Sequence, residues 1–411
     1  MAFYNGEAGS YENFHCSMQS PENGVVSTHA SADLQRLPLH GIRVLEFGHT
    51  ILGPCCGMVL ADLGADVLKI EPPGGEHTRR LKGFGAGYFA YFNRNKRSIV
   101  LDYKSASGLR DAQDLIRSAD VLIENMAPGA LKRAGLGETD VRELNARLIY
   151  CSLKGFLPGP YGSRVALDEV VQMMSGLAYM TGPPGKPLRA GTSITDILGG
   201  VFGAVGILAA LRERDLSGLG HSVECGLFET AAFLMGQHMA YSATTRESIP
   251  PMPARVSAWA VYEIFESSDS AQIFIGITSD AQWQRFCAAF DRPQLLADPR
   301  YATNASRIDS REHLIKALTD TFGEMTGEEI MRRCERSVIP FAPVARPEAL
   351  FSDPHLLATG SLAATRMPDG SVAQLPKLPI RIDHAALGLR ASPPELESPS
   401  ERQAPPQQVR P

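Results

Sequence analysis

The 411-residue sequence predicts an α/β protein, with an open, doubly wound parallel sheet in a large domain and a smaller α+β domain after it. Between residues 41 and 152, short apolar runs alternate with longer segments of helical pattern, which favours parallel strands joined by helices. A glycine-rich turn at 48–54 follows the first apolar run, as in strand-to-helix connections. A Pro-rich segment at 249–253 precedes two successive strand-like runs, which predicts a hairpin in a second domain.

The first half of the chain predicts a parallel sheet. Helical segments are expected around Met58, from 108 to 118 and around Leu131. Each lies between strands, so the chain repeats a βαβ unit with a right-handed crossover. Parallel strands place their carboxyl ends at one edge of the sheet, where ligands bind in this class of fold. The strands are expected at 41–47, 65–70, 97–102, 120–124 and 148–152.

The second half begins with a helix from Asp196 to about Arg212, followed by a turn at 218–225 into one further strand. A long apolar helix is expected from Leu227 to about Ala243. Beyond the Pro-rich segment, the sequence predicts strands at 260–265 and 272–277 and helices at 280–289, 313–322 and 328–336, with irregular structure from Pro347 onward.

Composition shifts divide the chain into six segments. The two ends lack apolar periodicity and are expected to be flexible or disordered, whereas the parallel-sheet pattern and the hairpin pattern define two folded domains. The expected segments are 1–38 (N-terminal tail), 39–228 (large domain), 229–255 (helix and linker), 256–346 (small domain), 347–391 (return to the large domain) and 392–411 (C-terminal tail).

The charge and the cysteines indicate the compartment and exclude several partners. A net charge of −5 gives no general attraction to nucleic acid or to an anionic membrane. Seven cysteines without metal-ligand spacing, including the adjacent Cys55 and Cys56, predict a reducing compartment and no metal site. The apolar run at 197–211 is too short for a membrane span, and no secretory signal is expected. We therefore expect a cytoplasmic protein.

The glycine-rich turn after the first strand is not a nucleotide fingerprint. Gly48, Gly53 and Gly57 are too widely spaced for the Gly-x-Gly-x-x-Gly pyrophosphate cradle, although Glu71 could have been its acidic residue. No Gly-x4-Gly-Lys-Ser/Thr phosphate loop occurs either. The sequence thus argues against a nicotinamide-dependent or ATP-dependent enzyme.

Cations and amides lie immediately before or after several of the expected strands. Residues 93–97 carry three cations and two amides, Lys104 follows the next strand, and Asn125 precedes a helix start at 128–133. Each group could grip phosphates at the sheet edge, or could be a solvated surface run. Together they suggest a ligand with several phosphates and no nucleoside fingerprint.

Two carboxylates open neighbouring helices. A polar, Gly-containing turn within 188–200 places Asp196 at the start of an apolar helix. Free backbone N–H groups and the positive end of the helix dipole are expected there. Asp168 opens the helical segment at 165–176. Either residue could be a helix cap, and together they could form a nucleophile and its orienting partner. His49 and His238 have no Ser or Cys elbow beside them, which argues against a hydrolase triad.

These patterns, in this order, resemble the class III coenzyme A transferases, a family that includes formyl-CoA transferase, carnitine CoA-transferase and acyl-CoA racemases. The similarity runs through most of residues 40–230 and weakens toward 350. The matching stretches are GIRVLEF at 41–47, MVLADLGADVLKIE at 58–71, NKRSIVLD at 95–102, DVLIEN at 120–125, Pro128-Gly, LIY at 148–150, Gly155-Phe and GILAAL at 206–211.

The resemblance implies that Asp196 is a covalent nucleophile. Its carboxylate would attack an acyl-CoA thioester to give a mixed anhydride and then an aspartyl-CoA thioester, and a helix N-terminus would keep the carboxylate ionised. Asp168 would orient or tune the site. The resemblance also makes 39–228 a Rossmann-like CoA-binding domain. The implied CoA contacts are His49, Thr50, Ile51, Leu101, Lys104, Asn125, Met126 and Arg133.

Three departures narrow the choice within the family. Formyl-CoA transferase has a glutamine at the position of Ile51 and a glycine-rich loop where residues 251–259 read PMPARVSAW, so formate and oxalate are not expected as acceptors. The racemases have a histidine at the position of Leu167, so a two-base proton exchange would lack one base. A racemase and a non-catalytic acyl-CoA-binding protein remain as alternatives.

The segments 253–262 and 279–283 are similar to the branch that handles C4–C5 dicarboxylic acids. Succinate, mesaconate, citramalate and itaconate are typical substrates there, and intramolecular transfer within mesaconyl-CoA is an alternative. We expect Arg255 to pair with the distal carboxylate of such an acid.

The resemblance further implies an interlocked, ring-like homodimer. It implies no permanently bound cofactor and no metal, with the CoA thioester as a substrate. The expected partners are therefore small molecules and a second copy of the chain.

Overall fold

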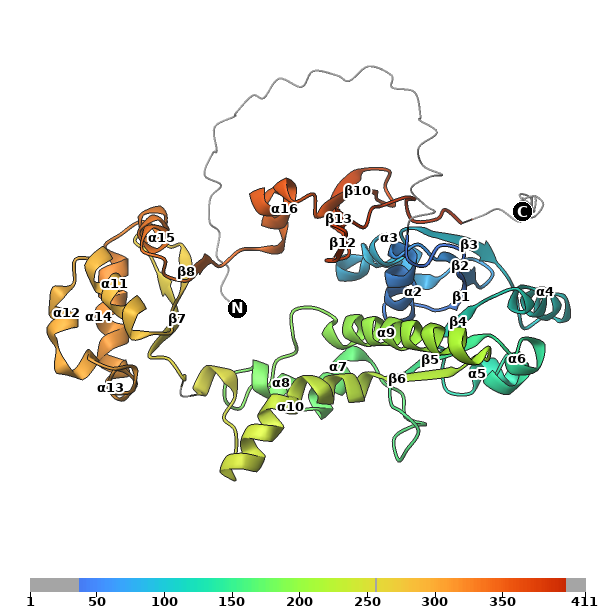
Figure 1. The fold of residues 1–411 in the computed structure, drawn as a ribbon, viewed down its shortest axis with the longest axis horizontal. Coiled ribbons are helices and arrows are strands. Elements are labelled where there is room, and N and C mark those ends of the chain that lie inside the picture. Colours follow the sequence, from blue (N-terminus) through green and yellow to red (C-terminus); the bar gives the residue numbers. More distant parts are fainter. Residues whose placement is uncertain (1–36, 256, 397–411) are drawn as a thin grey trace, which may run out of the picture.

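The computed structural model describes residues 37–255 and 257–396. Most of the predicted N-terminal tail and most of the predicted C-terminal tail lie outside these residues. Figure 1 shows a large domain around one sheet, a small domain beside it, and a final segment that returns from the small domain to the large one.

The large domain is built on a six-stranded sheet with the order β3-β2-β1-β4-β5-β6, and all its strand pairs are parallel. The chain moves outward from β1 in one direction and then in the other, so the order reverses between β1 and β4. The predicted doubly wound parallel sheet is confirmed. The strands are β1 (Arg43–Phe47), β2 (Asp66–Glu71), β3 (Lys96–Val100), β4 (Val121–Glu124), β5 (Ile149–Lys154) and β6 (Ser222–Gly226).

Helices cover both faces of this sheet. On one face lie α2 (Leu52–Asp62) and α9 (Ile194–Ser217), and on the other lie α4 (Ala106–Arg117) and α6 (Glu138–Leu144). The remaining helices of this domain are α3 (Tyr88–Phe92), α5 (Ala130–Arg133), α7 (Asp168–Met174), α8 (Leu177–Thr181) and α10 (Leu227–Thr245), with the 3₁₀ helices η1 (His77–Arg80), η2 (Gly83–Gly85) and η3 (Met252–Ala254).

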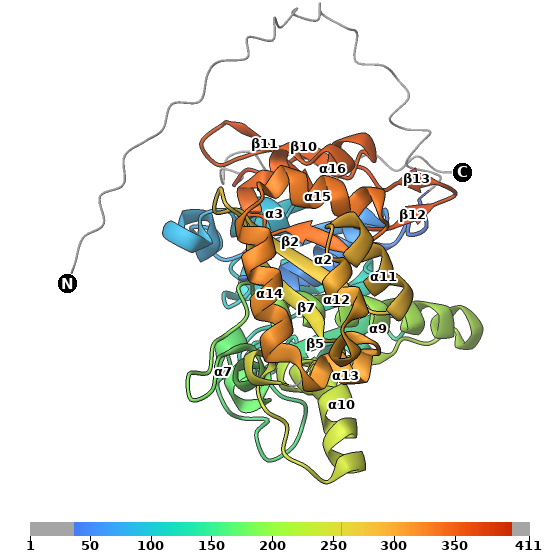
Figure 2. The same cartoon turned by 90° about the vertical axis from the view of Figure 1, so that its left-hand side faces the viewer.

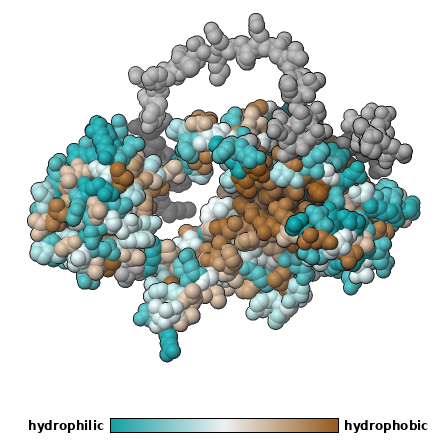
Figure 3. Space-filling model, viewed as in Figure 1, coloured by the Kyte–Doolittle hydropathy of each residue, from teal (hydrophilic) through white to brown (hydrophobic). Residues whose placement is uncertain are grey.

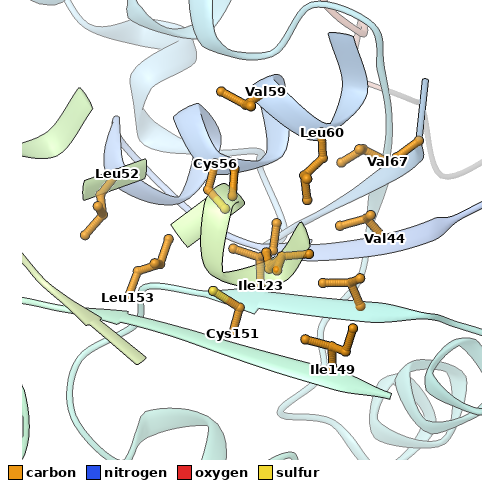
Figure 4. Packing of buried hydrophobic residues seen from close by; sticks show 14 of the residues in the cluster. Val44, Leu52, Cys56, Val59, Leu60, Val67, Ile123, Ile149, Cys151 and Leu153 are labelled. Atoms are coloured by element: carbon orange, nitrogen blue, oxygen red, sulfur yellow. The ribbon is translucent and has the colours of Figure 1, made fainter. Parts of the chain in front are cut away.

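Strand alternation divides the apolar side chains between two cores. Val44 packs with α2 and α9, and the next residue, Leu45, packs with α4 and α6 on the opposite face. Figure 4 shows Val44, Ile123 and Cys151 of the first core beneath the side chains of α2. Because both faces are covered, the strands read as continuous apolar runs in the sequence.

Glycines let α9 pack closely against α2 and the sheet. A Cβ atom on Gly200 would lie 2.7 Å from the Cβ of Cys55, and one on Gly203 would lie 2.7 Å from a methyl group of Leu153. Both distances are shorter than van der Waals contact, so the close approach requires glycine at these positions. This packing holds the first turns of α9 and α2 side by side.

The length of α9 corrects one expectation. The helix has 24 residues, longer than the predicted apolar run, and it is long and apolar enough to cross a membrane. Its most apolar window is 44% buried within the protein, and the core helix of a folded domain passes the same test. The length of this apolar segment therefore does not exclude a membrane span, and the absence of a membrane partner stays a prediction.

The small domain contains an antiparallel sheet with the order β7-β8-β9 and a separate apolar core around Trp283, Phe286 and Phe322. The hairpin was predicted, but the short third strand was not. Figure 2 shows its helices from their outer side, in front of the sheet. The elements are β7 (Val261–Glu266), β8 (Gln272–Ile277), β9 (Phe341–Pro343), α11 (Asp280–Ala289), α12 (Pro293–Ala297), η4 (Pro299–Tyr301), α13 (Asn304–Asp309), α14 (Arg311–Gly323) and α15 (Gly327–Arg336).

The expectation of irregular structure after Pro347 is wrong in part. The segment forms two antiparallel strand pairs, and the five-residue strands at 362–366 and 372–376 mix small, polar and apolar residues without a clear apolar alternation. The side-chain oxygen of Asn95 accepts hydrogen bonds from the backbone N–H groups of Arg390 and Ala391, which fastens the returning chain to the large domain. The elements are η5 (Pro347–Ser352), α16 (Pro354–Ala358), β10 (Leu362–Arg366), β11 (Val372–Pro376), β12 (Arg381–Ile382) and β13 (Ala385–Ala386).

Candidate active site

Asp196 is the third residue of α9 and does not cap this helix. The N-cap position belongs to Ser193, whose side chain makes no capping hydrogen bond. The Asp196 side chain is half-buried, and among the described residues no group donates a hydrogen bond to its carboxylate or forms an ion pair with it. The capping alternative for Asp196 is therefore wrong, and its carboxylate oxygens are available to a ligand.

Asp168 caps α9 from the neighbouring helix α7. Its buried carboxylate accepts hydrogen bonds from the backbone N–H of Thr195 at 2.8 Å and of Asp196 at 3.2 Å, and from the Thr195 hydroxyl. These are the N–H groups that a helix N-terminus leaves without partners. The capping interpretation of Asp168 thus holds, but for α9 rather than for its own helix.

Gln172 completes this arrangement. Its amide nitrogen donates to the Asp168 carboxylate at 2.5 Å, and its amide oxygen accepts from the backbone N–H of Ala190 at 2.8 Å. One side chain of α7 therefore fixes both Asp168 and the turn that leads into α9. The sequence analysis missed Gln172, although its position four residues after Asp168 places both on one helix face.

Carboxylates dominate the electrostatics at Asp196. Burial, together with the negative charges of Asp168 and Glu169, raises the pKa of Asp196 to about 7. Glu169 itself pairs with Arg189, in the turn before α9. The expectation that the helix N-terminus keeps Asp196 ionised is wrong, because Asp168 occupies the helix N–H groups and adds a like charge.

The turn between β1 and α2 is held by Asn125. The Asn125 side-chain oxygen accepts from the backbone N–H of His49 at 2.9 Å, and its amide nitrogen donates to the backbone oxygen of His49 at 3.0 Å. A Cβ atom on Gly53 would lie 2.8 Å from the same side-chain oxygen, so glycine permits this approach. Two of the predicted CoA contacts are thus joined at the carboxyl ends of β1 and β4.

Thr50, in the same turn, has an unusual backbone conformation. Its φ angle is 65°, a left-handed value that is an outlier for a β-branched residue. Its backbone N–H donates to the Glu76 carboxylate at 2.7 Å, and its hydroxyl lies 2.9 Å from Nδ1 of His49. Burial lowers the pKa of His49 below its ordinary value. Outliers of this kind cluster at ligand-binding sites, where neighbouring groups hold them in place.

The other predicted CoA contacts differ in exposure. Ile51 and Leu101 are buried in apolar clusters, so their side chains point into the protein. Met126 is half-buried after β4. Lys104 and Arg133 are exposed, and neither belongs to an ion pair in the part of the chain that the structure describes. These two cations are available to an anionic ligand at the carboxyl edge of the sheet.

The apolar cluster that contains Ile51 also links the turn between β1 and α2 to Asp196. Ile51 packs with Cys55 and Met58 of α2, and Ile197, which follows Asp196, packs against the same cluster. The Cys55 thiol lies 3.5 Å from the backbone oxygen of Ile197. The structure therefore brings the β1–α2 turn and Asp196 to the same end of the α2–α9 pair.

The cation-rich segment at 93–97 is not a phosphate site. Arg94 is buried and pairs with Asp62 at 2.7 Å, and the Lys96 ammonium is buried against the Glu46 carboxylate at 2.6 Å. Arg97 is exposed and pairs with Asp66. The phosphate-gripping interpretation of this segment is wrong, because Arg94 and Lys96 pair with buried carboxylates and Arg97 pairs with a carboxylate at the surface.

The segment 128–133, which was predicted to be a helix start suited to an anion, also differs from that prediction. Helix α5 has only four residues, too few to form an effective anion-binding dipole. The Arg133 guanidinium donates to the backbone oxygen of Pro128 at 3.2 Å. Any role of this segment toward an anion therefore depends on the Arg133 side chain rather than on a helix dipole.

A buried network of four charges lies beneath α2, and the sequence analysis did not find it. Glu46 pairs with both Lys69 and Lys96, and Lys69 also pairs with Glu76. Although burial opposes its ionisation, the two ammonium groups hold the pKa of Glu46 below its ordinary value. Burial lowers the pKa of Lys96 to about 8. Charged residues inside the apolar runs of β1 and β2 were the signal for this network.

Arg255 follows η3 in the linker to the small domain. It is half-buried, and its guanidinium lies 2.9 Å from the sulfur of Met252. It takes part in no ion pair among the residues that the structure describes. The linker contacts α8 through a hydrogen bond of 3.2 Å from the Tyr179 hydroxyl to the backbone oxygen of Ile249. This places the linker beside the α7–α8 region.

Two surface pockets lie away from the candidate residues. One surface pocket lies in the returning segment, between 355 and 381, and another lies between β3 and residues 394–395. Neither contains Asp196, Asp168 or a predicted CoA contact. Within the described residues, no group of three or more His, Cys, Asp or Glu side chains could hold a metal ion.

Comparison with known sequences identifies relatives along most of the chain. A succinate–glutarate CoA-transferase of Agrobacterium fabrum is 34% identical over 373 residues, which cover 87% of this chain and 93% of that protein. The human succinyl-CoA:glutarate CoA-transferase is 31% identical over 376 residues, covering 87% of this chain and 84% of the relative.

A solved structure and a family model agree with these relatives. The crystal structure of a CAIB/BAIF family protein from Brucella suis has a TM-score of 0.79 and 30% identity, covering 88% of this chain and 96% of that chain. The model of CoA-transferase family III matches residues 39–399. The predicted enzyme class is confirmed: the chain belongs to CoA-transferase family III.

Proposed function

We propose that this enzyme transfers coenzyme A between succinyl-CoA and a second C4–C5 dicarboxylic acid, with Asp196 as the covalent nucleophile. The observation that carries this proposal is the unpartnered, half-buried Asp196 carboxylate beside the turn of the predicted CoA contacts. Relatives that are named for succinyl-CoA together with glutarate or malate support the choice of substrates.

The reaction proceeds through two covalent aspartyl intermediates. An Asp196 oxygen attacks the donor thioester carbonyl, the C–S bond breaks, and CoA thiolate leaves a mixed anhydride behind. The thiolate then attacks the Asp196 carbonyl, which releases the donor carboxylate and forms an aspartyl-CoA thioester. The acceptor carboxylate repeats these steps in reverse, so that CoA leaves on the acceptor and the Asp196 carboxylate is regenerated.

The surroundings of Asp196 suit this chemistry. A carboxylate with a pKa near 7 is a stronger nucleophile than an ordinary aspartate and remains partly ionised at neutral pH. Asp168 acts as a positioning residue, since it holds the first turn of α9 and leaves the Asp196 oxygens without competing donors. Lys104 and Arg133 bind phosphate groups of CoA from the carboxyl edge of the sheet.

Arg255 binds the distal carboxylate of the dicarboxylic acid. Its guanidinium has no carboxylate partner among the described residues, and its linker contacts the helix that follows α7. A guanidinium can bind a carboxylate through two parallel hydrogen bonds, which would favour dicarboxylic over monocarboxylic acceptors.

The functional unit is a homodimer. Figure 3 shows a broad hydrophobic area on one face of the large domain, over α2 and α9. Apolar side chains of α9 and α10 are largely exposed in the single chain: Val205 at 55%, Phe233 at 70% and Met239 at 64%. Exposed apolar surface of this kind marks interaction sites. Sedimentation equilibrium would test this assignment, and a monomer at micromolar concentration would contradict it.

The enzyme works in the cytoplasm with small-molecule partners and without a permanently bound cofactor. Its described cysteines are free thiols, and all but Cys225 are buried, which suits a reducing compartment. Fractionation of source cells followed by an activity assay would test the location.

Trapping of the intermediate tests the mechanism. Incubation with succinyl-CoA followed by hydroxylamine or borohydride should modify Asp196, as read by peptide mass, and Asp196→Ala should abolish exchange. Exchange of CoA with Asp196 unmodified would overturn the covalent mechanism. Solvent deuterium incorporation at the acyl α-carbon without an acceptor would indicate a racemase, and binding without turnover would indicate a non-catalytic acyl-CoA-binding protein.

A further inference from the structure

The backbone of the turn between β1 and α2 is bonded to side chains at each of its first three residues. The backbone oxygen of Gly48 accepts from the Lys69 ammonium at 2.8 Å. Both backbone groups of His49 are bonded to Asn125. The backbone N–H of Thr50 donates to Glu76 at 2.7 Å. The conformation of this turn therefore depends on side chains that come from β2, from the loop after β2 and from the end of β4.

Thr50 needs such support because of its backbone conformation. A φ angle of 65° is unfavourable for a β-branched residue, so an isolated turn with threonine here would prefer another conformation. Conformations of this kind persist when surrounding contacts determine them. The hydrogen bond from the Thr50 N–H to Glu76 is a direct contact of this kind.

Glu76 is itself fixed from several sides. Its carboxylate pairs with Lys69 at 2.7 Å and accepts a hydrogen bond of 2.5 Å from the Thr78 hydroxyl. Its backbone N–H donates to the Glu71 carboxylate at 2.8 Å. The side chain is only 3% exposed. Glu76 therefore presents a preorganised acceptor to Thr50 rather than a mobile one.

The buried charges continue from Glu76 beneath α2 and return to its first turn. The Lys69 ammonium donates hydrogen bonds to Glu46 and to the backbone oxygen of Gly48, and it forms an ion pair with Glu76. The Lys96 ammonium donates to the other Glu46 oxygen at 2.6 Å and to the backbone oxygen of Pro54 at 2.8 Å. The chain of alternating charges thus holds the turn at Gly48, at Thr50 and at the start of α2.

We propose that Glu76 is a positioning residue that keeps the β1–α2 turn in its CoA-binding conformation through the Thr50 N–H, with Lys69 anchoring its carboxylate. The proposal rests on the proposed function, in which this turn contacts the CoA thioester. Glu76 controls the affinity for CoA and leaves the chemistry at Asp196 unchanged.

The test compares Glu76→Ala with Asp62→Ala. Asp62 is an equally buried carboxylate with a cationic partner, but it lies at the far end of α2 and does not contact the turn. Both substitutions should lower the melting temperature. Glu76→Ala should raise the dissociation constant of coenzyme A, measured by calorimetry, about tenfold, because it leaves the turn without its acceptor. The value of kcat at saturating succinyl-CoA and glutarate should change less than about threefold. Asp62→Ala should change neither quantity.

A double-mutant cycle separates positioning from a general structural role. Thr50→Gly removes the backbone strain, so Glu76→Ala should weaken CoA binding less in the Thr50→Gly background than in the wild-type chain. Equal effects in both backgrounds would overturn the proposal. An unchanged dissociation constant in folded Glu76→Ala, or an equal rise in Asp62→Ala, would also overturn it.

If Glu76→Ala does not fold, Glu76→Gln provides the same information, since its amide oxygen can still accept from Thr50 but its ion pair with Lys69 is lost. Binding should then weaken by a smaller factor, and unaltered binding would contradict the proposal. Failure of the proposed function is separate, because it would appear as exchange activity in Asp196→Ala whatever the result at Glu76.

Discussion

The Asp168 carboxylate accepts hydrogen bonds from the backbone N–H groups of both Thr195 and Asp196, which lie 27 and 28 residues further along the chain. One aspartate therefore caps the helix that carries the other. The two carboxylates therefore have different roles. Asp168 caps the helix, and the side-chain oxygens of Asp196 remain available to a ligand.

Replacement of Asp168 should separate its capping role from its charge. Asp168→Ala leaves two buried N–H groups without acceptors, so the free energy of unfolding should fall by about 2 kcal/mol. Asp168→Asn keeps an acceptor and removes the negative charge, so the pKa of Asp196 should fall. Urea denaturation and the pH profile of kcat/KM measure the two effects. A pH profile of Asp168→Asn that matches the wild type would show that the charge does not act on Asp196.

Activity should rise with pH through the neutral range. Burial and the nearby carboxylates raise the pKa of Asp196 to about 7, and the nucleophile must be ionised. The value of kcat/KM for succinyl-CoA should therefore fall about tenfold for each pH unit below about pH 6. Steady-state rates between pH 5 and 8 measure this dependence, and a flat profile would contradict it.

The same pKa predicts how stability changes with pH. Asp196 has an ordinary pKa of 3.8 when unfolded and about 7 when folded, so the folded chain binds the extra proton between these values. Its contribution to stability is therefore lost as pH rises through this window. Asp196→Asn should have little effect near pH 4 and should stabilise the protein by up to about 4 kcal/mol at pH 8. Chemical denaturation at both pH values measures the difference, and equal effects at both would contradict the raised pKa.

Arg255→Ala should impair dicarboxylic acceptors selectively. Loss of the guanidinium should raise KM for glutarate about tenfold or more while leaving the rate with butyrate unchanged. Arg255→Lys, which keeps the charge and loses the paired hydrogen bonds, should be intermediate. Initial rates with each acceptor at fixed succinyl-CoA provide the measurement. An unaltered KM for glutarate, with Asp196→Ala inactive, would reject this role for Arg255.

The close packing of α9 against α2 should not tolerate a side chain at Gly200. A Cβ atom there would lie 2.7 Å from the Cβ of Cys55, so Gly200→Ala should lower the free energy of unfolding by about 1–3 kcal/mol and displace Asp196. Gly236 of α10 has no neighbouring atom within 4 Å of such a Cβ, so Gly236→Ala should raise it by about 0.5–1 kcal/mol. Thermal unfolding of the two variants measures the difference, and an equal change in stability in both would contradict the prediction.

The sheet was predictable because its strands are covered on both faces. Runs such as the one around Val44 and Leu45 carry apolar residues on both faces of the sheet, and the intervening helices have a different period. The third strand of the small domain was missed because it has only three residues. The strands after Pro347 were missed because sequences such as LAATR at 362–366 contain few large apolar residues. In such strands neither alternation nor a continuous apolar run identifies the element.

The parallel sheet, the family and the position of Asp196 at the start of a helix follow from the amino-acid sequence alone. They depend on local periodicity and on motifs that are contiguous in the chain. Other features emerge only in the folded protein: Asp168 caps α9, Glu76 supports Thr50, and some cations are left available to a ligand. Arg94 and Lys96 look like surface cations in sequence, yet buried carboxylates pair with them, whereas Lys104 and Arg133 stay exposed. The reason is physical: burial and charge pairing depend on partners that are distant in sequence, and folding alone brings them together.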